Sequence, residues 1–586
     1  MRASADEGRT PGGEALSVTF PRIKCPVGAR TWPGRALRYC LPTPWHGRSR
    51  SVRVFSEVPP AKRIRGLRPV AAIASMSLLA GCGMLSSEGS DDEETITVGT
   101  MSAPSTLDPA KAWDSSWELY RNVFQTLLSF PSGATEPEPD AAESCKFSDA
   151  SSTVYTCELR EGLKFSDGDT LDAAAVKYSF DRIRTINAKG GPTGLLGSLD
   201  KVETKGDLTV VFHLKKADAT FPFVLATPAM SIVDPKEYPA DKLREGDELT
   251  GSGPYTLDAY TPNDKADLVK NDHYEGAADV KNDAVTIRYF KKSSAMVDAL
   301  KNKQIDVTFR GLASEDIVAM QGRGRREQDI ELVEGSGTEI RYLVFNTKDP
   351  WARKLPVRRA VAQLVDRGAI AHKIYKDTVE PLYSMVPRGL TGHATGFFDK
   401  YGNPSVAKAR KILTDAGINQ PVPLTLWYTT DRYGSATEPE FAELKRQLEG
   451  SGLFEITLKS RPWTEFQEGY SNGEYPVFGR GWFPDFPDAD NFIAPFVGPK
   501  NVLNTPYPSK EITDEVLPRE RREADRGAVI DQFERAQEIL VDDVRLLPLW
   551  QGKQYIMSSE EIAGGERALD PSAIMMMWEL QRKTSW

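Results

Sequence analysis

The sequence predicts a mixed α/β body that begins near residue 95. Thr95–Gly99 alternate polar and apolar side chains, which is the period of a half-buried strand. From Trp117 to Phe130, apolar side chains recur at the spacing of one helix face. Two short segments, Ser144–Phe147 and Thr153–Leu159, flank a turn and predict a hairpin. The chain beyond residue 94 is long enough for two or more such domains.

A short apolar run precedes this body and ends in LLAGC, Leu78–Cys82. The run, Pro69–Gly81, follows a basic cluster at Lys62–Arg68, and this order is typical of a secretory signal. It is too short to span a bilayer, which needs about 20 apolar residues. LLAGC resembles the lipobox of bacterial lipoproteins, which implies a lipid on the Cys82 thiol and cleavage before it. The alternative is an ordinary cysteine buried in a core helix.

The stretch before Cys82 is expected to be leader and not fold. Met1–Pro60 has scattered Arg and Pro without either period, so we expect translation to start further downstream, near the basic cluster. Cys82–Glu94 is small and acidic and is expected to be a flexible tether. The chain has 83 acidic and 74 basic residues, and the leader holds mostly basic ones. The body that remains is strongly acidic, and this disfavours nucleic acid or anionic lipid as a binding partner.

Two cysteines, Cys145 and Cys157, lie on opposite arms of the predicted hairpin. In an exported protein, an isolated pair across a short turn indicates a disulfide, which would stabilise the fold by about 3 kcal/mol. The alternative is two free thiols that face apart. Neither cysteine has the spacing of a metal or redox site, and the sequence suggests no cofactor. It also lacks a His-Glu-x-x-His pair and a Walker loop, which disfavours an enzyme.

Five segments together resemble the extracellular solute-binding proteins of the peptide/nickel class. In the first, Asp167-Gly168 predicts a turn and Leu171-Asp172 the start of a helix. In the fourth, Pro356 is expected at the first helical position and Arg358 on the solvent side. The five segments are Thr156–Ile183 (TCELREGLKFSDGDTLDAAAVKYSFDRI), Gly251–Tyr255 (GSGPY), Lys270–Gly276 (KNDHYEG), Arg341–Arg367 (RYLVFNTKDPWARKLPVRRAVAQLVDR) and Gly479–Phe492 (GRGWFPDFPDADNF).

The resemblance implies a periplasmic-binding-protein-like fold of type II, with two α/β lobes and a hinged cleft between them. The first lobe would comprise residues 95–338 and 555–586, with an extra subdomain at about 141–231. The second lobe would comprise residues 339–554. The implied function is the substrate-binding component of an ABC importer, lipid-anchored outside the cell membrane. As a monomer, it would capture di- or oligopeptides and deliver them to permease subunits that work with their own ATPases.

The resemblance also implies a ligand site. In peptide binders of this class, an Asp three residues after the Gly-Trp tryptophan pairs with the ligand's ammonium, and Asp485 has that place after Gly481-Trp482. Gly481 and Phe483 would offer backbone groups, and Trp482 would line the first side-chain pocket. Asp114 and Ser115, which precede the first helix, are further candidates. The alternative is a solvated acidic turn, because other aspartates alternate with prolines there.

Three other functions stay open. A protein of the same fold could bind a non-peptide solute such as an oligosaccharide or an opine, which ligand identification would reveal. A peptide-sensing receptor would leave peptide uptake intact when the gene is deleted. An enzyme would show turnover.

Overall fold

The computed structural model describes residues 95–322, 329–498 and 500–583. The predicted leader, Cys82 and the tether lie outside these residues. Within the described part, no helix is both long enough and apolar enough to cross a membrane. The main feature is an eleven-stranded sheet in the order β15-β14-β16-β12-β17-β11-β1-β10-β9-β8, with β13 paired to β17 beside this path.

The elements fall into two groups around separate cores, which we call the first and second lobes. The first lobe has the following elements: β1 (Ile96–Thr100), α1 (Trp117–Val123), β2 (Leu128–Ser129), β3 (Glu138–Pro139), β4 (Ala142–Phe147), β5 (Val154–Leu159), α2 (Ala173–Ile186), β6 (Leu199–Lys205), β7 (Thr209–Leu214), α3 (Phe221–Leu225), β8 (Tyr255–Thr261), β9 (Lys265–Lys270), β10 (Ala284–Tyr289), α4 (Ser293–Lys301), β11 (Val307–Phe309), α5 (Ser314–Gly322), β18 (Ile562–Ala563) and β19 (Gln581–Arg582).

The second lobe has the following elements: α6 (Leu355–Leu364), α7 (Arg367–Ala369), β13 (Val379–Pro381), α8 (Gly396–Tyr401), α9 (Val406–Asp415), β14 (Val422–Thr429), α10 (Thr437–Gly450), β15 (Phe454–Arg461), α11 (Trp463–Ser471), β16 (Val477–Trp482), α12 (Leu517–Glu520) and α13 (Ile530–Asp543). Its apolar side chains form two buried clusters, whereas those of the first lobe form one large cluster and a smaller one near α4 and α5.

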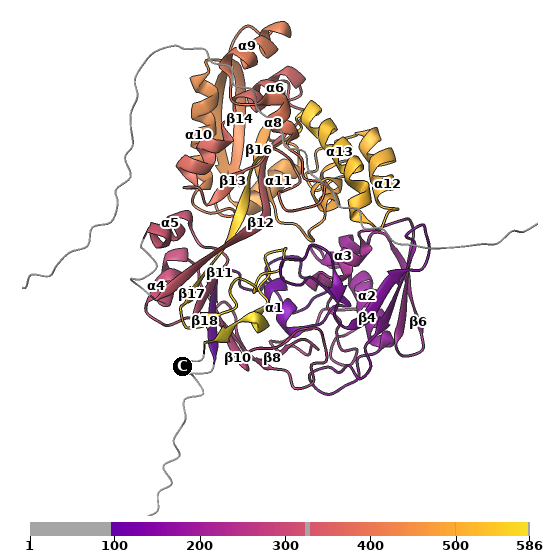
Figure 1. The fold of residues 1–586 in the computed structure, drawn as a ribbon. Coiled ribbons are helices and arrows are strands. Elements are labelled where there is room, and N and C mark those ends of the chain that lie inside the picture. The colour runs from indigo at the N-terminus through magenta and orange to yellow at the C-terminus, as the bar shows by residue number, and fades with distance from the viewer. Residues whose placement is uncertain (1–94, 323–328, 499, 584–586) are drawn as a thin grey trace, which may run out of the picture. The chain divides into compact units, whose positions relative to one another are not determined.

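Two long strands, β12 (Ile330–Phe345) and β17 (Leu546–Ser559), belong to both lobes (Figure 1). They pair antiparallel, and their ladder is interrupted between Ser336 and Ile340. On one side of this interruption β17 also pairs with β11 of the first lobe, and on the other side β12 pairs with β16 of the second lobe. The two α/β lobes of the predicted fold are therefore confirmed, and two neighbouring strands connect them.

The hairpin and its disulfide are also confirmed. Strands β4 and β5 pair antiparallel with Cys145 opposite Cys157, and the two sulfurs are bonded. They extend into a separate four-stranded sheet in the order β4-β5-β7-β6. Helix α2 covers this sheet, and the ring centres of Phe180 and Phe212 lie 5.0 Å apart. Asp172 caps α2 as predicted, because its side chain accepts a hydrogen bond from the backbone N–H of Ala175.

Three local predictions were wrong, two of them because contacts from distant segments decide the outcome. The helix expected over 117–130 ends at Val123, and Leu128 lies in β2. The carbonyl of Val123 instead accepts a hydrogen bond from Gly253 N–H at 2.8 Å, in a contact too close for any residue with a Cβ. Arg358 is only 3 % exposed and pairs with Asp543 at 2.6 Å, although solvent was expected around it. Pro356 lies one position later than predicted, since Leu355 begins α6.

Candidate ligand site between the two lobes

The site is built around Asp485, in the loop that follows β16. Its side chain is buried, with 7 % of the residue exposed. Trp113 Nε1 donates a hydrogen bond to Oδ1 at 2.5 Å, and Asn491 Nδ2 donates one to Oδ2 at 3.1 Å. Trp113 precedes α1 of the first lobe, whereas Asp485 belongs to the second. The carboxylate therefore stands where the two lobes meet.

No cation balances this carboxylate within the part of the chain that the structure describes. Asp485 takes part in no ion pair there, and both of its hydrogen-bond donors are neutral. Burial raises the pKa of Asp485 to about 6, although the bonds from Asn491 and Trp113 oppose this rise. A buried carboxylate with a raised pKa would be stabilised in its ionised form by a ligand cation.

Asn491 holds the loop in this geometry. Its Oδ1 accepts hydrogen bonds from Asp485 N–H at 2.9 Å and from Trp482 Nε1 at 3.1 Å. Its Nδ2 meanwhile donates to the carboxylate, so one amide fixes both the backbone and the side chain of Asp485. Asn491 and Trp113 were not among the site residues predicted from the sequence. Asn491 lies inside the family-like segment Gly479–Phe492, so its proximity to Asp485 was a usable signal. The residues around Trp113 give no sign that it bonds to Asp485, which is 372 residues away.

The three neighbours of Asp485 in the predicted site have different surroundings. Gly481 pairs with Arg341 in β12, and a Cβ on Gly481 would lie 2.0 Å from Arg341 Nη1. Any side chain here would displace that guanidinium. Trp482 is half-buried, with its ring packed edge-on against Phe496 at 5.0 Å. Phe483 is 41 % exposed, so its side chain is free to contact a ligand.

Asp114 and Ser115 lie in the same loop as Trp113, but local bonds hold both. The carboxylate of Asp114 accepts hydrogen bonds from Ser105 Oγ at 2.5 Å and from Ser116 N–H at 2.9 Å. Ser115 Oγ donates to the carbonyl of Ala103 at 2.9 Å. It is therefore Trp113 that the structure joins to Asp485, and the two predicted residues order the loop that carries it.

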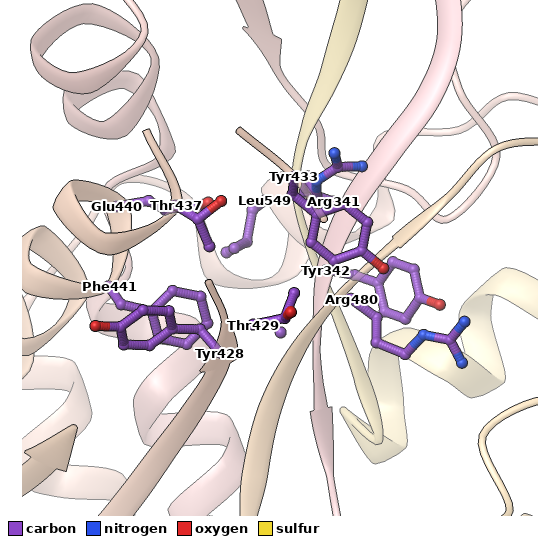
Figure 2. Close-up of a pocket in the computed structure, with 11 residues that line it drawn as sticks. Arg341, Tyr342, Tyr428, Thr429, Tyr433, Thr437, Glu440, Phe441, Arg480 and Leu549 are labelled. Atoms are coloured by element: carbon purple, nitrogen blue, oxygen red, sulfur yellow. The ribbon is translucent and has the colours of Figure 1, made fainter. Parts of the chain in front are cut away.

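A small pocket lies beside Arg480 of β16 on the second lobe (Figure 2). Figure 2 shows Tyr428 and Phe441 at one side, away from Arg341 and Arg480, and their rings are tilted by 31° with centres 5.0 Å apart. The space open to a water-sized group is about 10 Å³, which is room for a single water and not for a peptide. The residues that line it are Arg341, Tyr342, Tyr428, Thr429, Tyr433, Thr437, Glu440, Phe441, Gly479, Arg480 and Leu549.

The other two aspartates of the loop are neutralised by arginines. Asp488 accepts two hydrogen bonds from Arg526, at 2.8 and 3.0 Å, and Asp490 accepts two from Arg521, at 2.9 and 3.0 Å. Asp488 and Asp490 are 5 % and 4 % exposed. The alternative of a solvated acidic turn is therefore wrong, because all three aspartates are buried.

Comparison with known proteins defines the class of this two-lobed fold. Residues 136–504 match the model of the bacterial extracellular solute-binding proteins, family 5. This match covers more than half of the chain, and the chain belongs to that family.

Individual relatives are distant but nearly full-length. The chain is 25 % identical over 486 residues to the probable D,D-dipeptide-binding periplasmic protein DdpA of Escherichia coli K12, covering 80 % of this chain and 91 % of that protein. It is similar in fold, with a TM-score of 0.70 and 20 % identity, to the dipeptide-binding protein of Pseudoalteromonas sp. SM9913 in complex with Met-Leu, covering 83 % and 100 %. It is also similar to the binding protein AgaA of Agrobacterium tumefaciens in complex with agropinic acid, with a TM-score of 0.68, 22 % identity and coverage of 84 % and 99 %.

Proposed function

We propose that this protein captures short peptides in the cleft between its lobes and delivers them to the permease of an ABC importer. The observation that carries the proposal is the buried Asp485 carboxylate, which has no cation beside it among the described residues and stands where the lobes meet. A peptide's terminal ammonium would supply that cation. An exposed Phe483 and the backbone of the same loop would contact the first residue of the peptide.

Opening and closing would occur about the interrupted ladder of β12 and β17. On β12 the interruption between Ser336 and Ile340 contains the proposed lobe boundary at residues 338/339. On β17 it lies between Gln551 and Lys553, just before the proposed boundary at 554/555. A ligand that touches both lobes favours the closed form by its differential affinity, and the permease with its ATPases would recognise that form. One chain carries both lobes, so a monomer is sufficient for this function.

The membrane link is proposed to be a lipid on Cys82. Support comes from the order of basic cluster, apolar run and LLAGC in the sequence. Cys82→Ser should abolish incorporation of radiolabelled palmitate and release the protein into the medium. A Cys82→Ser protein that is still labelled and still membrane-bound would rule the anchor out.

Ligand identity is the experiment that tests the peptide proposal. Native mass spectrometry of the purified protein should reveal a retained peptide, and deletion of the gene should reduce uptake of that peptide. Recovery of a non-peptide solute would support the second candidate, since the agropinic acid complex is a protein of the same fold. Unchanged peptide uptake after deletion would instead favour a sensing receptor.

A further inference from the structure

Three carboxylates gather on the surface of the first lobe, at a place that the ligand site does not use. Asp167 and Asp169 lie in the turn before α2, and Asp234 follows strand β7 and helix α3 in the chain. One carboxylate oxygen from each residue lies within 4.8 Å of those from the other two. This spacing allows all three oxygens to contact one cation at the 2.3–2.6 Å that calcium prefers.

Asp234 distinguishes this group from an ordinary acidic surface. The residue is only 1 % exposed, and its Oδ1 accepts a hydrogen bond from Lys236 N–H at 2.7 Å. Its Oδ2 is buried and has no hydrogen-bond partner among the described residues. A buried oxygen of this kind is costly unless something pairs with it. The exposed Asp167 and half-exposed Asp169 leave the group open to solvent on the other side.

The positive charges near Asp167, Asp169 and Asp234 among the described residues do not balance the three carboxylates. Lys236 Nζ contacts Asp169 at 2.6 Å, but 72 % of that lysine side chain is exposed. Such a surface pair is worth little and can open easily. Burial raises the pKa of Asp234, and the charges of Asp167 and Asp169 raise it further, while the Lys236 N–H and side chain oppose the rise. One lysine thus faces three carboxylates.

From this geometry we infer that Asp167, Asp169 and Asp234 form a divalent-cation site, with calcium as the preferred ion. Carboxylate oxygens in an irregular arrangement suit calcium better than magnesium, which demands a near-ideal octahedron. Asp167 and Asp169 would supply ligands from the exposed turn, and Asp234 would supply the buried one. Solvent would complete the coordination, because calcium takes six to eight oxygens.

The ion would fasten two surface turns of the first lobe together. The turn that carries Asp167 is closed by the Gly168 N–H bond to the carbonyl of Phe165 at 2.9 Å. The second turn is closed by the Tyr238 N–H bond to the carbonyl of Asp234 at 3.0 Å. Tyr238 is fully buried, so the second turn is anchored in the core. Bound calcium would therefore raise the thermal stability of this lobe.

Calorimetric titration of the purified, chelator-treated protein with calcium chloride tests the site. Wild type should bind one calcium per chain with a Kd of about 10⁻⁴–10⁻³ M, the range of extracellular calcium modules. Asp234→Asn should weaken binding at least tenfold, because it removes the charge of the buried ligand. Lys236→Gln should tighten binding, since the competing ammonium is gone. Calcium should also raise the melting midpoint of wild type and not that of Asp234→Asn.

A matched control removes an equal charge elsewhere. Asp415 pairs with Lys411 on the exposed face of α9, and Asp415→Asn should leave calcium binding unchanged. Circular dichroism would report whether Asp234→Asn is folded. If it is not, Lys236→Gln still decides, because a folding defect cannot tighten binding. The site is refuted if wild type gives no saturable binding up to about 10 mM calcium, or if wild type and the folded site variants bind equally.

Discussion

Asp485 and its two neighbours in the same loop, Asp488 and Asp490, are equally buried but differ in their partners. Asp488 and Asp490 each receive two hydrogen bonds from an arginine, whereas Asp485 receives bonds only from a tryptophan and an amide. Although burial raises the pKa of Asp490, the charge of Arg521 and further bonds hold it below its ordinary value. Burial instead raises the pKa of Asp485 to about 6.

This difference in partners indicates that Asp488 and Asp490 have a structural role, whereas Asp485 is available to bind a ligand. The arginine partners are Arg521 and Arg526, in the segment before α13, and their hydrogen bonds to Asp490 and Asp488 hold the loop against the rest of the second lobe. Asp485 therefore lies in a well-anchored loop, with no cation beside its carboxylate among the described residues. Removal of a charge should therefore have opposite effects on stability at the two kinds of position.

The largest expected effect on stability is at the buried pair of Asp488 and Arg526. Their side chains are 4 % and 2 % exposed, and Glu520 contacts the same guanidinium at 2.6 Å. Arg526→Met should lower the free energy of unfolding by about 3–5 kcal/mol, because it leaves buried carboxylates without a cation. Urea unfolding measures this. The double variant Arg526→Met, Asp488→Leu should recover part of the loss, and a loss below about 1 kcal/mol in the single variant would contradict a structural role.

The disulfide between Cys145 and Cys157 lies in the first lobe, and its contribution to stability can be compared with that of the arginine pair. Replacement of both Cys145 and Cys157 by serine should lower the free energy of unfolding by about 3 kcal/mol, since the bond closes a loop of 12 residues. Peptide affinity should not change, because the hairpin sheet contributes no residue to the proposed site. A fall in peptide affinity together with the fall in stability would show that the subdomain of strands β4–β7 determines the shape of the cleft. Peptide mapping without reduction verifies the bond in wild type.

The third expected effect on stability is a gain, and it depends on pH. Because the folded pKa of Asp485 is about 6 and its ordinary value is 3.8, the folded state retains a proton that the unfolded state has lost between about pH 4 and 6. The contribution of Asp485 to stability therefore falls as the pH rises through this window. Asp485→Asn removes the cost of ionisation and should be up to about 3 kcal/mol more stable than wild type above pH 6.

Urea unfolding at several pH values tests this sign. The advantage of Asp485→Asn should disappear below about pH 4, where the wild-type carboxyl is protonated in both states. A variant that is less stable than wild type at pH 7 would mean that Asp485 is stabilised by a partner that the hydrogen-bond geometry does not include. Asp490→Asn is the matched control, and it should destabilise at the same pH because it removes the carboxylate that receives two hydrogen bonds from Arg521.

Local sequence signals predicted the features that local interactions determine. The mixed α/β content, the cap of α2 at Asp172 and the hairpin with its disulfide follow from periodicity, turn residues and cysteine spacing, whereas the two-lobed fold was implied by the family resemblance. The end of α1 did not, because Gly253 closes on Val123 from another segment. The same limit applies to Arg358, whose partner Asp543 is 185 residues away.

The candidate site was predictable only in part for the same reason. The resemblance indicated Asp485 and its strand, and the structure places them between the lobes. Neither Trp113 nor the arginines at 521 and 526 could be assigned, because pairing over such separations depends on the fold. Three aspartates in one short segment therefore looked alike in sequence, although within residues 95–322, 329–498 and 500–583 Asp485 alone of the three lacks a cation.

The most direct test of the ammonium role is calorimetry with the peptide recovered from the protein and with its N-acetylated form. Wild type should bind the free peptide and reject the acetylated one, because acetylation removes the charge that Asp485 would balance. Asp485→Asn should lose about 3–5 kcal/mol of binding free energy, which is at least a hundredfold in Kd, while it remains folded. Equal affinity of wild type for the free and acetylated peptides would contradict the pairing of Asp485 with the terminal ammonium of the peptide.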